Sequence, residues 1–435
     1  MLSSAQMGWH FSKIKTDAHQ NLYDELNGKG ERYMRKRLLG LLLVLAMILS
    51  LAACSSTDTS KTEQTTAPAE TTETTTPAQE TEAGGKTLKI GLVAAVTGTE
   101  PLEGERMVQG LELALDEYNA AGKVNDITIE FEIQDSQGTP DGMVNAAQKL
   151  IADGCQILLG PQKSSHVMAI GDILDEAKVP FIAGGTSPKL KGAYDYLFTC
   201  RTNDIYMASI GAQVCKDTLG AKKVGVFYVS DDFGTGGLSV AEEYFTENGI
   251  EYTSEAYNSG DADVSGQILN LMNADVDCIM MWVHGVDLPV ISRTMGQLGC
   301  EIPVIASSGA SLRMYLDLCE PEWLEGWYAV AEYADSNPKE IVQEYAKNFK
   351  AKTGEDGELY GATYYGAFQA VVQCLKNGAE PTSDSLYNAL KEVKDVQGII
   401  GTLTCDNDQF LMHDAILVQI ENLQPQVLES VTAEY

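Results

Sequence analysis

Apolar and polar positions follow one recurring arrangement along residues 86–435. A short run of consecutive apolar residues, as in Leu88–Val96, is followed by a polar turn. A segment with apolar residues three or four apart then follows, as from Met107 to Tyr118. The first pattern is typical of a strand buried on both faces of a sheet, and the second of a helix with one apolar face. The alternation predicts an α/β fold built around parallel sheets.

This arrangement runs through two rounds and restarts after Arg201-Thr202-Asn203. Two rounds predict two doubly wound lobes, each a sheet with helices on its faces. Three helices and two further strands then close the chain. The expected strands are Leu88–Val96, Ile127–Ile133, Ile157–Leu159, Val179–Ala183, Lys223–Val229, Ile250–Tyr257, Asp277–Val283, Pro303–Ala306, Ala415–Glu421 and Gln426–Ser430, and the expected helices include Tyr206–Leu219, Leu288–Leu298, Pro338–Thr353, Tyr360–Asn377 and Ser383–Val393.

The segment Ile157–Pro188 is the clearest β-α-β unit. Its first strand leads through Gly160-Pro161 to a helix that starts at Ser164-Ser165, and its second strand ends in Gly184-Gly185-Thr186. Ligands of open α/β sheets lie beyond the carboxyl ends of the strands. A helix start suits an anion because its N–H groups lack partners, and a glycine turn lets backbone carbonyls approach a ligand. The two turns therefore predict a site for a small solute with two polar ends, although an ordinary helix cap and an ordinary glycine turn have the same pattern.

A secretory signal is expected at residues 34–53. The basic start Met34–Arg37 precedes an apolar run, Leu38–Leu49, which is too short for a stable membrane span. The following Leu51-Ala-Ala-Cys54 resembles the lipobox of bacterial lipoproteins, in which the Cys is acylated. We therefore expect lipidation of Cys54 rather than an uncleaved anchor helix, and a true start at Met34, with residues 1–33 arising from a mis-called start.

Residues 54–85 carry the lipidated Cys and then mostly Thr, Glu, Ala and Pro. A segment with so few large apolar residues cannot bury enough surface to offset the entropy of ordering, so we expect a disordered linker. The formal net charge of the whole chain is −32. That charge leaves no basic surplus for phosphates, which excludes nucleic acid as an expected partner, and it indicates an acidic, solubilising surface.

Motifs of catalysis and metal binding are not found in the sequence. The nine cysteines include no C-x-x-C, and no Cys/His cluster has zinc spacing, so we expect free, mostly buried thiols and no metal. No G-x-S-x-G, H-E-x-x-H, P-loop or G-x-G-x-x-G occurs, so we expect no enzyme and no cofactor. Phe233-Gly-Thr-Gly-Gly reads as a plain strand-to-helix turn. His284 ends a buried strand, as either a pocket lining or a rim residue.

A succession of short motifs resembles the solute-binding proteins of branched-chain amino acid ABC importers, typified by the Leu/Ile/Val-binding protein. The motifs are Lys89-Ile-Gly-Leu-Val, Leu159-Gly160 with Ser164-Ser165, Phe181-Ile with Gly-Gly-Thr-Ser-Pro, Val226 with Asp232-Phe233-Gly234, and Tyr360 with Tyr364-Tyr365-Gly366. The resemblance covers residues 86–435. It implies a type I periplasmic-binding-protein fold, with two Rossmann-like lobes joined by three crossovers, which closes on a ligand by hinge motion. Lobe 1 would comprise residues 86–202 and 336–405, and lobe 2 residues 203–335 and 406–435.

The resemblance also implies the ligand-binding residues. The loop of Ser164 and Ser165 would hold the α-carboxylate of an amino acid. The turn of Gly184 and Thr186 would meet its ammonium group through a carbonyl and a hydroxyl. The walls of the side-chain pocket would come from Phe233, His284 and Tyr360.

Two positions depart from the pattern of the Leu/Ile/Val-binding protein. Ser308 stands where that protein pairs a Glu with the ammonium group, and Glu103 stands where it has an aromatic residue. A buried ammonium group needs a counter-charge. Either Glu103 or Asp232 supplies one, or the ligand is not an α-amino acid. The family's disulfide is not expected, because Lys163 occupies one of its cysteine positions.

The function implied is that of a monomeric, lipid-anchored extracytoplasmic receptor. It would capture a small solute, an amino acid of the branched-chain or a related kind, and deliver it to the permease subunits of an ABC transporter. The alternatives are the same fold binding an amide, urea or an aromatic carboxylate, and a ligand-sensing receptor without a transport role. An exported enzyme is disfavoured because the motifs are absent.

Overall fold

The computed structural model describes residues 86–432, which belong to one compact unit. The predictions of a mis-called start at residues 1–33, a signal peptide at 34–53, a lipidated Cys54 and a linker at 54–85 all lie outside the described residues.

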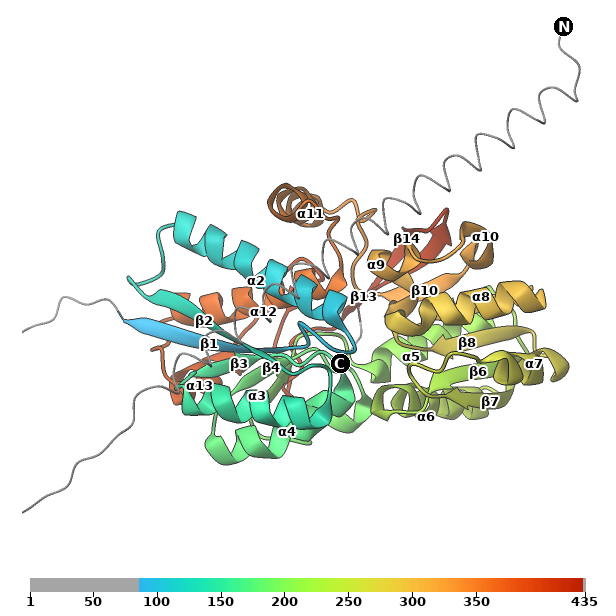
Figure 1. The fold of residues 1–435 in the computed structure, drawn as a ribbon, viewed down its shortest axis with the longest axis horizontal. Coiled ribbons are helices and arrows are strands. Elements are labelled where there is room, and N and C mark those ends of the chain that lie inside the picture. The colour runs from blue at the N-terminus through green and yellow to red at the C-terminus, as the bar shows by residue number, and fades with distance from the viewer. Residues whose placement is uncertain (1–85, 433–435) are drawn as a thin grey trace, which may run out of the picture. The chain divides into compact units, whose positions relative to one another are not determined.

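The first sheet has five parallel strands in the order β2-β1-β3-β4-β5 (Figure 1). Strand β1 is an interior strand and is buried along most of its length, whereas the edge strand β2 is partly exposed, which explains its alternating pattern. The strands are β1 Thr87–Ala94, β2 Thr128–Asp135, β3 Ile157–Leu159, β4 Phe181–Ala183 and β5 Leu197–Thr199.

Helices cover both faces of this sheet. Helices α2 (Pro101–Ala120) and α12 (Leu359–Lys376) lie on one face, and α3 (Pro140–Ala152) and α4 (Ser164–Ala177) lie on the other (Figure 1). Successive strand residues point to opposite faces, so Leu159 packs with α2 and α12, while Leu158 packs with α3 and α4. Two separate buried clusters therefore hold one sheet between four helices.

The second sheet has seven strands in the order β14-β13-β10-β9-β8-β6-β7. Strands β6 to β10 pair in parallel. Strand β13 pairs antiparallel with β10, and β14 pairs antiparallel with β13. One large apolar cluster joins this sheet to its helices. The strands are β6 Lys223–Val229, β7 Glu251–Tyr257, β8 Cys278–Trp282, β9 Val304–Ala306, β10 Tyr328–Ala331, β13 Asp414–Glu421 and β14 Gln424–Thr432, and the main helices are α5 Asp204–Gln213, α6 Asp232–Glu247, α7 Ser265–Asn273 and α8 Leu288–Leu298.

The two sheets confirm the predicted α/β fold of two Rossmann-like lobes. Helix α11 (Glu340–Thr353) and helix α13 (Ser383–Leu390) pack into the cluster of the first sheet, so the chain returns there after β10. Met412 belongs to the cluster of the first sheet, and Ala415 belongs to the cluster of the second sheet, so the chain passes from one cluster to the other between these residues. The lobe boundaries at 202/203, 335/336 and 405/406 stay predictions. Smaller elements complete the chain: α9 Arg313–Leu316, α10 Pro321–Leu324, β11 Val396–Gln397 and β12 Thr402–Leu403.

Three elements differ from the sequence prediction. Helix α2 begins at Pro101, whose fixed φ suits a first helical position, and not near Met107, so Glu103 lies in its first helical turn. Helix α6 begins at Asp232, so the glycines after Phe233 lie inside a helix rather than in a turn. At Gly237 an added Cβ would lie 2.2 Å from Cδ1 of Trp282, so glycine permits close packing of α6 on the sheet. Strand β5 was missed.

No helix within residues 86–432 is long and apolar enough to cross a membrane. In the same range, no group of three or more His, Cys, Asp or Glu residues is placed to hold a metal ion. The eight cysteines described there are free thiols, and five of them are buried: Cys155, Cys200, Cys215, Cys278 and Cys374.

Candidate ligand-binding site

A narrow cavity lies where the carboxyl ends of strands from both sheets converge. Its volume is about 20 Å³, room for roughly one water molecule. The turn after β3 supplies Gln162, Lys163 and Ser164, and the turns after β4 and β5 supply Thr186 and Arg201. The remaining lining residues come from the second sheet and its helices and from α12: Phe233, Val283, His284, Gly285, Ser308, Gly309 and Tyr360. This is the position at which open α/β sheets bind ligands.

The hydroxyl of Ser164 connects the two turns that the sequence singled out. Its Oγ accepts hydrogen bonds from the backbone N–H groups of Thr186 and Ser187, both at 3.1 Å. The hydroxyl proton of Ser164 is therefore free to donate to a ligand oxygen. Thr186 Oγ1 donates to Asp204 at 2.8 Å and keeps its acceptor capacity. Burial raises the pKa of Asp204.

Arg201 is a buried cation at the base of the cavity. Its Nε lies 2.9 Å from Glu332 Oε1, a second bond joins the same carboxylate, and the guanidinium also donates to Ser308 Oγ at 2.9 Å. The side chain of Glu332 is fully buried. Burial alone would lower the pKa of Arg201, but the adjacent Glu332 outweighs that effect and raises it. Ser308, which stands where the Leu/Ile/Val-binding protein has a Glu, thus contacts the cationic side chain of Arg201.

Lys163 is the second cation of the cavity. It immediately precedes α4, and its nearly buried ammonium group pairs with the nearly buried carboxylate of Glu100. Burial alone would lower the pKa of Lys163, but the charges of Glu100 and Glu103 outweigh it and raise the pKa. Among the described residues that line the cavity, none is Asp or Glu. The charged groups that face the cavity are therefore cations, each with a buried carboxylate partner, Glu100 or Glu332.

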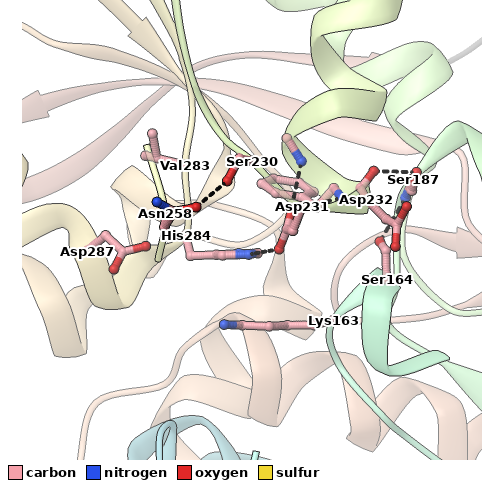
Figure 2. A network of polar contacts seen from close by, with 12 residues as sticks. Lys163, Ser164, Ser187, Ser230, Asp231, Asp232, Asn258, Val283, His284 and Asp287 are labelled. Atoms are coloured by element: carbon pink, nitrogen blue, oxygen red, sulfur yellow. Dashed lines mark hydrogen bonds and ion pairs between the residues drawn. The ribbon is translucent and has the colours of Figure 1, made fainter. Parts of the chain in front are cut away.

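Aromatic rings form the wall on the side of the second sheet. The rings of Phe233 and His284 are stacked, with centroids 5.0 Å apart. His284 Nε2 lies 2.7 Å from Oδ2 of Asp231 (Figure 2). The other carboxylate oxygen of Asp231, Oδ1, caps α6 by accepting hydrogen bonds from the N–H groups of Phe233 and Gly234. Burial would raise the pKa of Asp231, but the His284 contact and these hydrogen bonds outweigh it and lower the pKa. Lys163 extends beneath His284 and Asp231 (Figure 2).

The structure brings six of the ten predicted ligand-binding residues to this cavity: Ser164, Thr186, Phe233, His284, Ser308 and Tyr360. The other four do not line it. Ser165 is half-buried, and Asp232 forms an ion pair with Lys189 at 2.8 Å, with a third of its side chain exposed. An added Cβ on Gly184 would lie 2.3 Å from Gln162 Oε1, so this glycine makes room for a neighbouring side chain. Glu103 lines a second, separate cavity.

Sequence reasoning missed the charged residues of the site. Lys163 was considered only as a replaced cysteine, and Arg201 only as part of a crossover. Both follow the end of a buried strand by a few residues. Charged residues directly after buried strands were the available signal, because the carboxyl ends of parallel strands meet at one edge.

The sheet topology and the cavity between strand ends define a solute-binding protein of the two-lobed kind. Residues 87–424 match the family described as periplasmic binding protein, so the chain belongs to that family. Its relatives include the Leu/Ile/Val-binding protein BraC3 of Rhizobium johnstonii, which is 24% identical over 326 residues, covering 73% of this chain and 87% of that protein. The family expected from the motifs is confirmed.

Solved structures share the fold. The branched-chain amino acid transporter substrate binding protein LivJ of Streptococcus pneumoniae, in complex with isoleucine, has a TM-score of 0.73 at 21% identity, covering 80% of this chain and 99% of that one. A solute binding protein of an ABC transporter from Rhodopseudomonas palustris, in complex with 3,4-dihydroxy benzoic acid, has a TM-score of 0.73 at 20% identity, covering 80% and 98%. At these identities the likeness establishes the fold.

Proposed function

We propose that the protein is the extracytoplasmic solute receptor of an ABC importer, anchored by a lipid on Cys54, and that it delivers a small carboxylate-bearing solute to the permease. An amino acid of the branched-chain or a related kind is the first candidate. The observation that carries the proposal is that Lys163, Arg201 and the Ser164 hydroxyl line the same cavity at the strand ends.

A carboxylate suits this cavity for physical reasons. Ser164 has a proton to donate, and the start of α4 adds the partial positive charge of a helix N-terminus. Lys163 and Arg201 each keep some donor capacity beyond their acidic partners. Hydrogen bonds to charged groups contribute about 1.5–3 kcal/mol each, so two or three of them contribute about 3–9 kcal/mol, and micromolar affinity needs about 8 kcal/mol.

Delivery to a permease requires opening and closing, and direct bonds between the halves support a closed state. Ser187 Oγ donates to the backbone carbonyl of Asp232 at 2.7 Å, next to the Lys189–Asp232 ion pair. Since the cavity has room for roughly one water molecule, a solute enters only when side chains or lobes move apart. A solute bound by residues of both halves would shift the equilibrium toward closure by its differential affinity.

A second candidate, a carboxylate without an ammonium group, is favoured by one observation. No acidic residue is among the described residues that line the cavity, so a buried ammonium group would have no counter-charge there. The stacked rings of Phe233 and His284 offer a flat apolar surface that suits an aromatic carboxylate. The relative that binds 3,4-dihydroxy benzoic acid shares the fold and shows that the fold accommodates such a ligand.

A thermal-shift screen tests the proposal and separates the candidates. The probes are L-leucine, L-isoleucine, benzoate, 4-hydroxybenzoate, benzamide and urea, each up to high millimolar concentration. A bound probe at a hundred times its dissociation constant adds about 2.7 kcal/mol to the free energy of unfolding. Stabilisation by the amino acids supports the first candidate, and stabilisation by the benzoates alone supports the second. A response to urea or benzamide and to no carboxylate would overturn the carboxylate assignment.

A further inference from the structure

A second, smaller cavity lies behind the first. Its volume is about 10 Å³, close to the lower limit for one water molecule. Its polar lining consists of Glu100, Glu103, Gln162 and His166, and the rest is backbone and apolar side chains from β1, α2, α3 and the turn after β3. Gln162 lines both cavities.

Two buried side chains at this cavity hold polar atoms without partners. Glu103 is 2% exposed, and its Oε1 accepts from the Tyr315 hydroxyl at 3.1 Å, but its Oε2 has no hydrogen-bond partner among the described residues. Gln162 is 7% exposed, and neither its amide oxygen nor its amide nitrogen has a partner in the same range. Buried polar groups are normally hydrogen-bonded, and each one left unpaired costs roughly 1–3 kcal/mol. These atoms therefore indicate a polar occupant.

Gln162 separates the two cavities and is held there without a hydrogen bond. Its amide lies close to the Cα of Gly184, where a Cβ would come within 2.3 Å of the amide oxygen. Rotating this side chain breaks no side-chain hydrogen bond among the described residues, and because Gln162 lines both cavities, we take it as the point at which they can join. A solute in the first cavity could thus extend one end to Glu103.

The two cavities differ in the sign of their charges. Lys163 and Arg201 line the first, whereas Glu100 and Glu103 line the second. A neutral donor at Glu103 would satisfy its free oxygen, but an ammonium group would also gain the attraction of the Glu103 carboxylate and of Glu100, which itself pairs with Lys163. Resting on the function proposed above, we propose that the solute is a carboxylic acid with an amine at its far end, bound with its carboxylate at Lys163 and Arg201 and its ammonium group at Glu103.

The ionisation of Glu103 supports this assignment. Burial, and then the charge of Glu100, raise the pKa of Glu103 to about 8. The other titratable groups that face it are Lys163 and His166 from the α4 region, Tyr315 from α9, and Glu358 and Tyr360 at the start of α12. Near pH 7 the carboxyl group of Glu103 is therefore mostly protonated, and an ammonium group that binds beside it expels the proton. Binding of an amine-bearing solute should release protons, and its affinity should rise as the pH increases from 6 to 8.

The test uses matched probes that differ only in the terminal amine: 4-aminobutanoate, 5-aminopentanoate and 6-aminohexanoate against butanoate, pentanoate and hexanoate. Isothermal titration in two buffers of different ionisation enthalpy gives affinity and proton release together. We expect the best amine probe to bind the full-length protein at least about tenfold more tightly than its partner, the ratio that 1.4 kcal/mol represents. The amine probe alone should release protons.

Two variants place the effect at Glu103. Glu103→Gln keeps the size of the side chain and an oxygen for the Tyr315 hydroxyl, and it should bring the ratio of the two affinities close to one. Glu112→Gln removes a charge from an exposed position of the same helix and should leave the ratio unchanged.

Each other outcome overturns the inference in an identifiable way. Equal binding of both probes by the unaltered protein rejects the second subsite but leaves the carboxylate site standing. A ratio that survives in Glu103→Gln rejects the role of Glu103. If no plain or amine-bearing carboxylate binds, the proposed function falls as well. Proton release measured on the unaltered protein keeps the test valid even if a variant is unstable.

Discussion

The wall of the cavity supplied by the first sheet and the wall supplied by the second sheet have different chemistry. The first wall presents Lys163, Ser164 and Arg201, which are two cations and a hydroxyl. The second wall presents the stacked rings of Phe233 and His284 among small residues. Charged donors select the end group of a solute, and an apolar ring surface selects its shape. Substitutions on the first wall should weaken the affinity for all carboxylates alike, whereas substitutions on the second wall should change the affinities of different carboxylates relative to one another.

The largest effect is expected for Arg201→Met, and it concerns stability. Removing one partner of a buried ion pair leaves Glu332 charged and unpaired, which costs about 3–5 kcal/mol. Chemical denaturation followed by circular dichroism measures this loss. The double variant Arg201→Met/Glu332→Leu should recover most of it, and equal losses in the single and double variants would contradict the buried pair.

A smaller effect is expected for Lys163→Met, on affinity. The loss of a charged donor should weaken binding of each carboxylate by about 1.5–3 kcal/mol, whatever the rest of the solute. Isothermal titration measures this loss of affinity, with the probes that stabilise the protein in the thermal-shift screen. Lys149→Met is the matched control, because Lys149 is exposed and pairs with Asp153 at the end of α3, outside the cavity. Similar losses in both variants would argue against a specific role for Lys163.

Ser164→Ala separates the two serines that the sequence proposed together. The variant should lose about 1–3 kcal/mol of binding free energy, and also stability, because the N–H groups of Thr186 and Ser187 lose their acceptor. Ser165→Ala lies outside the cavity and should change either quantity by less than about 0.5 kcal/mol. If Ser165→Ala weakens binding as much as Ser164→Ala, the carboxylate is held differently.

The smallest effect is expected for Phe233→Leu. Aromatic contacts contribute about 0.5–1.5 kcal/mol beyond buried area, so this variant should weaken aromatic carboxylates by that amount relative to aliphatic ones. Competition between benzoate and an aliphatic acid that also binds measures the ratio of the two affinities directly. An unchanged ratio would show that the second wall does not select shape through this ring.

The sequence predicted the scaffold well because each strand and helix has its own hydrophobic period. Ile157–Leu159, Lys223–Val229 and Leu288–Leu298 match the observed β3, β6 and α8. Strand β5, Leu197–Thr199, was missed although it is no shorter than β3, and three residues show no period that would set it apart from the loop before it. Helix α6 was placed too late because its early glycines, of which Gly237 packs against Trp282, look like a turn.

The site was harder to predict because contacts between distant turns depend on topology. Asp232 was proposed, but its neighbour Asp231 contacts the wall, since the direction of adjacent side chains depends on where the helix begins. The Arg201–Glu332 pair joins residues 131 positions apart, which no local pattern relates. Hydroxyl and glycine turns, in contrast, are local features, and they led to Ser164 and Thr186.

One carboxylate, that of Asp231, both begins helix α6 and fixes the imidazole of His284. Because its pKa is lowered below the ordinary value of 3.8, its stabilising contribution is complete above that value and disappears only in stronger acid. The ring surface should thus stay rigid in moderately acidified surroundings. Moderate acidification should therefore leave this helix cap and its contact with His284 in place, so a loss of binding near pH 5 would point to groups other than Asp231.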